Sequence, residues 1–354
     1  MRLERPRDNE DDGEERRKLD GREDQLKPFR RWPKHPHVTL MTRTLALAAI
    51  VLTTAVALLV PAGASATPVT VGLGDQTWNI FNDHYFQALG LKRVRVVTPW
   101  NVALSKGDRD WLDHYLEGMP EAGIEPLVSF GAANGTRCPA RPCKLPTTAQ
   151  FDRAFRAFRA RWPWIRTLSV WNEENHRSQP TFRNPEQAAR YFNIVKKRCR
   201  GCRIVAADVL DDPNMIRWIT RFRTVARGPR LWGLHNYRDS NPRRGQRYGG
   251  TKLLVRTVPG KIWLTETGGI VKFVLPNGHT LFPYSEKRAN VALGRLLRLA
   301  RAYRRKIERL YVYHWRQDEY GLNRFDAGLI RQDGKPRPSY YTLARWLRTP
   351  WFKP

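Results

Sequence analysis

The chain has 354 residues, of which 41% are hydrophobic and 27% charged, a balance typical of a globular protein. Its net charge is +30, from 63 Lys and Arg against 33 Asp and Glu. Such an excess favours polyanionic partners, and an acidic polysaccharide stays open as a substrate. An arginine-rich proteome would give the same excess. No basic motif with interleaved aromatic residues stands out, so the sequence predicts no nucleic-acid binding.

Three segments follow one another along the chain. Residues 1–40 mix both charges with few apolar groups, which predicts disorder. Residues 41–66 combine a basic start, an uncharged apolar run and the small residues Ala64-Ser65-Ala66, the pattern of a secretory signal peptide. We therefore expect Met41 to be the true start and the protein to be secreted. The alternative is an uncleaved anchor that holds residues 45–66 in a membrane, with residues 1–40 in the cytoplasm.

The predicted folded domain, residues 67–354, carries almost all of the charge. Residues 1–66 hold 12 Lys and Arg against 10 Asp and Glu, so the remaining 288 residues carry +28. Four cysteines fall in this domain as two close pairs, Cys138 with Cys143 and Cys199 with Cys202. In an exported protein, close pairs predict two local disulfides. A four-cysteine zinc site is the competing interpretation.

Eight short apolar stretches recur along the domain and are predicted to be strands. Their nearly continuous apolar character suits parallel strands that are buried on both faces. They span residues 69–74, 93–98, 125–130, 167–172, 203–208, 231–237, 261–266 and 309–315.

Helical patterns separate these stretches. Between residues 147 and 162, apolar residues from Phe151 to Trp162 recur at helical spacing, and Thr147 with Gln150 predicts a capping box. Eight strands that alternate with helices, within this length, predict a single α/β domain, a (β/α)8 TIM barrel. An open doubly wound sheet is the alternative, but no G-x-G-x-x-G or P-loop follows an early strand.

Two carboxylates stand at strand ends, where barrel active sites lie: Glu173 after the fourth strand and Glu266 on the seventh. A protonated acid that faces an ionised carboxylate is the arrangement that glycosidic cleavage needs. We expect Arg95 and Tyr237 to keep Glu266 ionised, and a less polar wall to keep Glu173 protonated. Trp100 is predicted to offer a flat apolar face to a sugar ring.

Several motifs resemble the clan A glycoside hydrolases, which are retaining (β/α)8 glycosidases. "VWNEEN" resembles their W-N-E-P-N signature, "WLTETG" their strand-seven nucleophile segment, and "LHNY" their strand-six pattern. The resemblance implies that Glu173 is the acid/base and Glu266 the nucleophile. It implies that Asn172 bonds a sugar hydroxyl.

Further roles follow from the same resemblance. Arg95 and Tyr237 would bond the nucleophile, His235 would line the subsite, and Trp315 would lie under the cleaved sugar. The tail "DAGLIRQDGKPRPSYYTL" resembles the closing segment of these barrels. No cofactor, no metal and no stable protein partner is implied, and the substrate is a poly- or oligosaccharide.

Two departures from the family pattern limit the assignment. Glu174 replaces the proline of the signature, and we interpret it as a structural or solvated charge. The domain leaves no room for the β-sandwich that accompanies the barrel in several clan families, so neither a family within the clan nor a sugar follows. Asp208, at the end of the fifth strand, is interpreted as a salt-bridge partner. A non-catalytic carbohydrate-binding protein on the same barrel and a basic cell-surface adhesin remain the alternatives.

Overall fold

The computed structural model describes residues 67–354 except 79, 134–137, 139–142, 244, 246–248 and 317–323. The expected disordered segment 1–40 and signal segment 41–66 lie outside the described residues. Within the described part, no helix is both long and apolar enough to cross a membrane.

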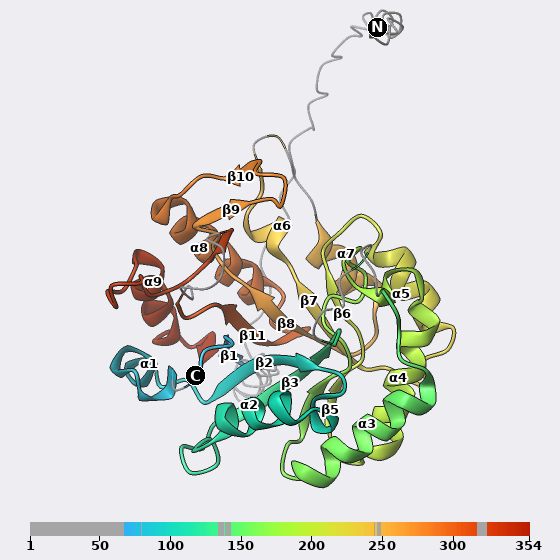
Figure 1. The fold of residues 1–354 in the computed structure, drawn as a ribbon. Helices are drawn as coiled ribbons and strands as arrows, with labels where there is room; N and C mark the ends of the chain where they lie inside the picture. The colour runs from blue at the N-terminus through green and yellow to red at the C-terminus, as the bar shows by residue number, and fades with distance from the viewer. Residues whose placement is uncertain are drawn as a thin grey trace, which may run out of the picture. The chain divides into compact units, whose positions relative to one another are not determined.

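All eight predicted strands are present, and they form one parallel sheet closed into a barrel (Figure 1). Several begin or end within one or two residues of the prediction, whereas the fourth and sixth are shorter. The strands are β1 (Val69–Gly74), β2 (Arg93–Pro99), β3 (Glu125–Gly131), β4 (Thr167–Ser169), β5 (Arg203–Val205), β6 (Asp208–Leu210), β7 (Leu231–His235), β8 (Lys261–Thr267) and β11 (Ile307–Tyr313).

The fifth predicted strand is split, and the barrel closes across the split. Hydrogen-bonded neighbours run in the order β5-β4-β3-β2-β1-β11-β8-β7-β6. Because β5 and β6 are consecutive parts of one stretch, broken only at Ala206 and Ala207, β5 joins β4 while β6 joins β7. The (β/α)8 prediction is therefore confirmed, and the doubly wound alternative is wrong.

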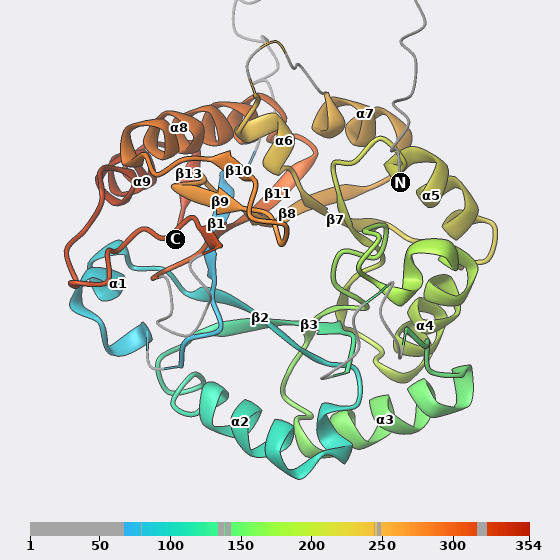
Figure 2. The same ribbon diagram turned by 45° about the horizontal axis from the view of Figure 1, so that its top comes forward.

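Helices surround the strands as an outer ring (Figure 2). In α3 the predicted capping box is present, because Thr147 and Gln150 each bond the other's backbone N–H. The helices are α1 (His84–Leu89), α2 (Lys106–Leu116), α3 (Thr148–Arg161), α4 (Pro185–Arg198), α5 (Met215–Arg223), α6 (Tyr237–Ser240), α7 (Gly250–Thr257), α8 (Glu286–Ala302) and α9 (Pro338–Leu347), with 3-10 turns η1 (Ile80–Asn82), η2 (Val102–Leu104) and η3 (Pro180–Arg183).

Two additions to the barrel were not predicted from the sequence. A small antiparallel sheet, in the order β10-β9-β12, is built from β9 (Lys272–Val274), β10 (Thr280–Phe282) and β12 (Phe325–Asp326). Its Phe325 packs edge-on against Tyr237, with ring centroids 5.5 Å apart. At the other end, β13 (Phe352–Lys353) pairs with the start of β1.

The barrel interior holds a cluster separate from the core between sheet and helices. Leu127, Val205, Trp263 and Tyr311 form it and are almost fully buried. Gly72 makes room for it, since a Cβ there would lie 2.8 Å from the ring of Tyr311.

The cysteines form the two predicted local pairs, with Cα–Cα distances of 5.0 Å for Cys138–Cys143 and 5.5 Å for Cys199–Cys202. No described cysteine is left free for zinc. The first pair follows β3, at the carboxyl ends of the strands, and the second precedes β5, at their amino ends.

Candidate active site

A cavity of about 260 Å³ opens at the carboxyl ends of the strands. Its walls come from the ends of β1 and β2, the loop after β4, and the ends of β8 and β11. The lining residues are Asp75, Gln76, Arg95, Val97, Asn172, Glu173, Glu266 and Tyr313. Four of the residues proposed from sequence, Arg95, Asn172, Glu173 and Glu266, thus meet at one cavity.

Glu266 is held from both of its carboxylate oxygens. Arg95 Nη1 donates to Oε2 at 2.8 Å, and the hydroxyl of Tyr237 donates to Oε1 at 3.2 Å. Arg95 is 2% exposed and lies on β2, and Glu266 is the sixth residue of β8. These two donors are the ones expected from the sequence. They fix the carboxylate in one orientation toward the cavity.

Glu173 has the backbone conformation that side chains usually avoid. Its φ is 52°, and it is the one non-glycine residue with a positive φ in the described part of the chain. Such a conformation costs about 1–3 kcal/mol and persists only where the surroundings impose it. Here His176 N–H donates to the carbonyl of Glu173 at 2.8 Å, and Glu174 N–H donates to the carbonyl of Asp208 at 3.1 Å. The turn aims the side chain of Glu173 into the cavity.

Glu174 takes the opposite direction. It is fully buried, and its Oε2 accepts the backbone N–H of Asp208 at 2.6 Å, which ties the loop after β4 to β6. Burial, with the nearby Asp208 carboxylate, raises the pKa of Glu174 well above its usual range. The buried carboxyl of Glu174 is therefore a structural group and not a solvated one.

A buried network of charges lies beneath the two cavity carboxylates. Arg95 Nη2 donates to Asn172 Oδ1 at 2.6 Å and to Asp208 Oδ2 at 3.3 Å. His235 places Nε2 3.3 Å from Asp208 Oδ1 and Nδ1 3.2 Å from Glu173 Oε1. Asp208 is thus shared by two cations, as the salt-bridge interpretation predicted.

The network shifts the protonation of its members. Burial lowers the pKa of His235, but attraction to Asp208 and Glu266 and hydrogen bonds to Asp208 and Glu173 outweigh it and raise that pKa to about 10. Burial raises the pKa of Asp208, and His235 and Arg95 overcome this and lower it to about 2. A pKa of about 10 favours the charged form of His235 at neutral pH, between the carboxylates of Asp208 and Glu173, while its Nε2 also lies 3.3 Å from Arg95 Nη2.

Contrary to the expectation from the sequence, burial does not raise the pKa of Glu173 on balance. Burial is the largest single cause and raises this pKa, but the hydrogen bond to His235 and the charges of His235, His176 and Arg95 together lower it below its ordinary value. The sequence missed this because His235 lies 62 residues away, and only the barrel brings its ring to Glu173.

The two cavity carboxylates are close to each other. One oxygen of Glu173, one of Glu266 and a ring nitrogen of His235 all lie within 4.8 Å of one another. Three such groups can hold a metal ion in principle. Here the groups bond their neighbours instead, with His235 Nδ1 3.2 Å from Glu173 Oε1 and Arg95 Nη1 2.8 Å from Glu266 Oε2.

The two predicted aromatic platforms do not line the cavity. Trp315 is 2% exposed, with its ring edge-on to Phe86 and its Nε1–H bonded to Asp83. Trp100 is half-buried and stacks on Phe151. Both rings are used in packing, because they point between the barrel and its helices. Tyr313, which ends β11, lines the cavity instead. In the sequence, only its place next to His314, where the last predicted strand ends, could have pointed to Tyr313.

Charge in the cavity is mainly negative. Asp75, Glu173 and Glu266 line it with a single cation, Arg95. Asp75 has a structural role, since its two carboxylate oxygens accept hydrogen bonds from the backbone N–H groups of Trp315 and Thr77. The large net positive charge of the chain does not come from the residues that line this cavity.

The barrel shares its fold with clan A glycoside hydrolases. A family 39 glycoside hydrolase of Bacteroides cellulosilyticus WH2 superposes with a TM-score of 0.55 at 16% identity, over 79% of this chain and 64% of that one. A family 39 β-xylosidase of Caulobacter crescentus gives 0.55 at 14%, over 79% and 70%. An endo-β-1,4-glucanase of Xanthomonas axonopodis pv. citri gives 0.56 at 12%, over 79% and 99%.

No protein-family model and no curated protein sequence matches this chain. The likeness is therefore one of fold, which the sequence motifs had predicted. The chain spans less than two thirds of the family 39 glycoside hydrolase of B. cellulosilyticus.

Proposed function

We propose that the protein is a retaining glycoside hydrolase that cleaves O-glycosidic bonds of a poly- or oligosaccharide. The observation that carries the proposal is the pair Glu173 and Glu266, which face one cavity with oxygens within 4.8 Å. Retaining enzymes hold their two carboxyl groups about 5–5.5 Å apart, whereas inverting enzymes leave about 6.5–9.5 Å for a water.

In the first step Glu266 attacks the anomeric carbon and the bond to the leaving oxygen breaks. Arg95 and Tyr237 support this role, because they orient the carboxylate without occupying the cavity. Glu173 passes a proton to the leaving oxygen. Since His235 Nδ1 lies 3.2 Å from Glu173 Oε1, the pair Glu173 and His235 holds that proton in the resting enzyme.

In the second step Glu173 takes a proton from water, and the resulting hydroxide displaces Glu266 from the sugar. Asn172 is positioned to bond a sugar hydroxyl next to the cleaved bond. Its Oδ1 accepts from Arg95, which leaves its amide N–H groups to face the substrate.

The sugar at the point of cleavage is proposed to be neutral. A carboxylated ring would meet the carboxylates of Asp75, Glu173 and Glu266 against one arginine that is already paired. For this subsite, the proposal therefore favours a neutral saccharide over an acidic one.

We also infer that the protein is exported. The sequence 41–66 and the two local cysteine pairs support this, because disulfides persist in oxidising compartments. N-terminal sequencing of protein from the medium should begin near Thr67. A membrane-bound product that keeps residues 1–40 would support the anchor instead.

A screen of chromogenic glycosides and neutral polysaccharides tests the catalytic proposal, with Glu266→Ala as control. Proton NMR of the first-formed product should show the anomeric configuration of the substrate. The lowered pKa of Glu173 favours a second candidate, a carbohydrate-binding protein without catalysis. Saturable sugar binding with no hydrolysis across the screen would establish that second function.

A further inference from the structure

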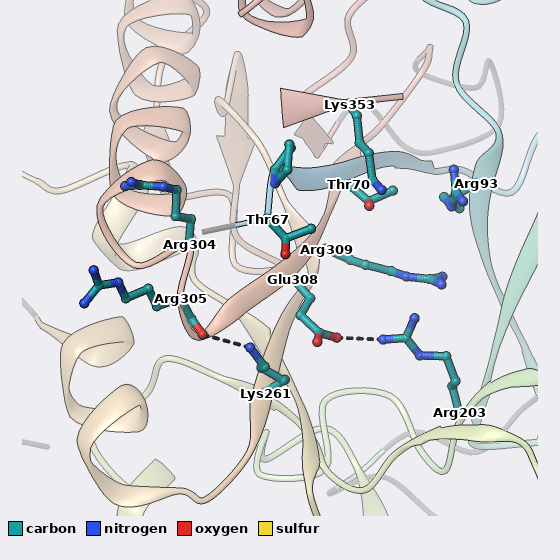
Figure 3. Close-up of a pocket in the computed structure, with 11 residues that line it drawn as sticks. Thr67, Thr70, Arg93, Arg203, Lys261, Arg304, Arg305, Glu308, Arg309 and Lys353 are labelled. Atoms are coloured by element: carbon teal, nitrogen blue, oxygen red, sulfur yellow. Dashed lines mark hydrogen bonds and ion pairs between the residues drawn. The ribbon is translucent and has the colours of Figure 1, made fainter. Parts of the chain in front are cut away.

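A second cavity lies at the other end of the barrel and belongs to no proposed reaction. It measures about 700 Å³ and opens where the strands begin. Seven Lys or Arg side chains and one carboxylate, Glu308, line it, together with Thr67, Pro68 and Thr70. We call it the basic pocket (Figure 3).

Three guanidinium groups gather on one side of the basic pocket. Figure 3 shows the ends of Arg93, Arg203 and Arg309 together, with the amine of Lys353 beside them, while Arg304 and Arg305 extend toward the opposite side. Arg93, Arg203 and Arg309 lie at or near the starts of β2, β5 and β11, and Lys353 lies on β13. Arg304 and Arg305 are neighbours between α8 and β11, and the barrel brings the other cations to them.

Two of the arginines are held rigidly. Arg309 is 6% exposed and makes two hydrogen bonds to Glu125, at 2.8 and 3.1 Å, and a third to Tyr311. Its guanidinium lies 4.2 Å from the ring centroid of Trp263, and that of Arg203 lies 4.7 Å from the same ring. Fixed, planar forks of this kind are suited to oxyanions, since little side-chain freedom is lost on binding.

The carboxylates near the basic pocket are too few to neutralise its cations. Glu308 pairs with Arg203 at 2.6 Å, and Glu125, just outside the lining, serves both Arg309 and Arg93. Among the described residues no carboxylate pairs with Lys261, Arg304, Arg305 or Lys353. Arg93 also donates to an oxygen of Pro354 at 3.1 Å. Even with these partners, the seven cations leave like charges facing a shared space, and a bound anion would relieve their repulsion.

We propose that the basic pocket binds an anion that carries two or more phosphate groups. A single small anion would leave most of the volume and charge unused. A carboxylated saccharide brings one charge for each bulky ring, whereas a phosphate group carries between about one and two charges in a compact tetrahedron. Linked phosphates therefore match both the size and the charge density of the pocket. The site lies apart from the proposed catalytic cavity and does not depend on its activity.

The probe is inorganic tripolyphosphate added to the full chain at constant ionic strength. At about one hundred times its dissociation constant, it should raise the Tm by about 5 °C. The double variant Arg203→Gln/Lys353→Gln should weaken binding, measured by calorimetry, by about tenfold or more. Arg217→Gln/Lys252→Gln is the matched control, since it removes one exposed Arg and one exposed Lys from helices α5 and α7.

Folding of each variant is checked by its Tm without ligand. The single variant Lys353→Glu gives a second measurement, because Lys353 is exposed on β13 and its replacement leaves the buried contacts of the barrel in place. It too should weaken tripolyphosphate binding. An equal loss in the matched control pair would mean that only the net charge of the chain attracts the probe, and the proposal would be wrong.

Two further arms identify the source of the phosphate groups. Vesicles with phosphatidylglycerol that co-sediment with the parent chain, but not with Arg203→Gln/Lys353→Gln, would place the phosphates on a lipid surface. Binding of tripolyphosphate without vesicle binding would indicate a free polyphosphate compound. Tighter binding of oligogalacturonate than of tripolyphosphate, or no pocket-dependent binding of either phosphate probe, would overturn the proposal.

Discussion

The two ends of the barrel differ in how their charged side chains are paired. At the carboxyl end, Arg95 and His235 are each matched by carboxylates, and the cavity itself is mainly acidic. At the amino end, seven cations share a cavity with one carboxylate. Paired charges hold one another in position, which suits groups that must react. Unpaired charges retain their attraction for a ligand, which suits binding. The net charge of +30 therefore says little about the proposed reaction.

The largest effect should come from Glu266, the proposed nucleophile at the carboxyl end. Glu266→Ala removes the group proposed to attack the sugar, so kcat should fall by about 10⁴-fold or more on every substrate. Added azide should restore turnover of an activated glycoside and give a product of inverted configuration, detected by proton NMR. An azide-rescued product of retained configuration would contradict a nucleophilic Glu266.

The next effect separates two adjacent glutamates. Glu173→Gln should lower kcat by about 10²–10⁴-fold on a substrate with a poor leaving group and far less on one with a good leaving group. Glu174→Gln is the matched control. Burial raises the pKa of Glu174, and a glutamine oxygen can still accept the N–H of Asp208, so activity should stay near that of the parent. If Glu174→Gln showed the leaving-group dependence instead, the acid would be Glu174 and not Glu173.

The buried network should make stability depend on alkaline pH. The pKa of His235 is about 10 in the folded chain and 6.5 ordinarily, so its charged form stabilises the fold fully below pH 6.5. That contribution is lost as the pH rises toward 10. The Tm of the parent should fall over this interval, and the slope between about pH 7 and 9 should be much smaller in His235→Gln. Equal slopes in both would show that His235 is not protonated in the folded protein.

Ionic strength should distinguish the two ends. The KM for a neutral glycoside should change little between about 0.05 and 0.5 M salt, whereas tripolyphosphate binding should weaken steeply, because screening acts on charged ligands. A KM that rises as steeply as the tripolyphosphate dissociation constant would point to an acidic substrate at the carboxyl end.

The smallest effects should come from the two disulfides, one at each end. Each closes a short loop, so its removal should cost about 2 kcal/mol of unfolding free energy. Cys138→Ser/Cys143→Ser should also lower kcat/KM a few-fold, because Cys138 N–H donates to the carbonyl of Ser178 in the loop that carries Glu173. Cys199→Ser/Cys202→Ser should leave kcat/KM unchanged. If both variants had the same kcat/KM, the first disulfide would have no influence on the cavity.

The sequence by itself determined the barrel and the two carboxylates that meet at its cavity. Buried parallel strands need continuous apolar runs, and such runs are visible without a structure. Glu173 and Glu266 were recognisable because each stands in a local motif at the end of a predicted strand. The capping box of α3 and the two cysteine pairs were readable for the same reason, since their partners are close in the chain.

Only the tertiary structure decided what depends on residues far apart in sequence. His235 lowers the pKa of Glu173 because the barrel closes, and Trp100 and Trp315 turn into packing positions because helices cover them. The basic pocket joins Arg93, Arg203 and Lys353, which share no pattern in the sequence. A strand pattern specifies which residues lie on a sheet, but electrostatic energies depend on distances that exist only once the sheet has closed.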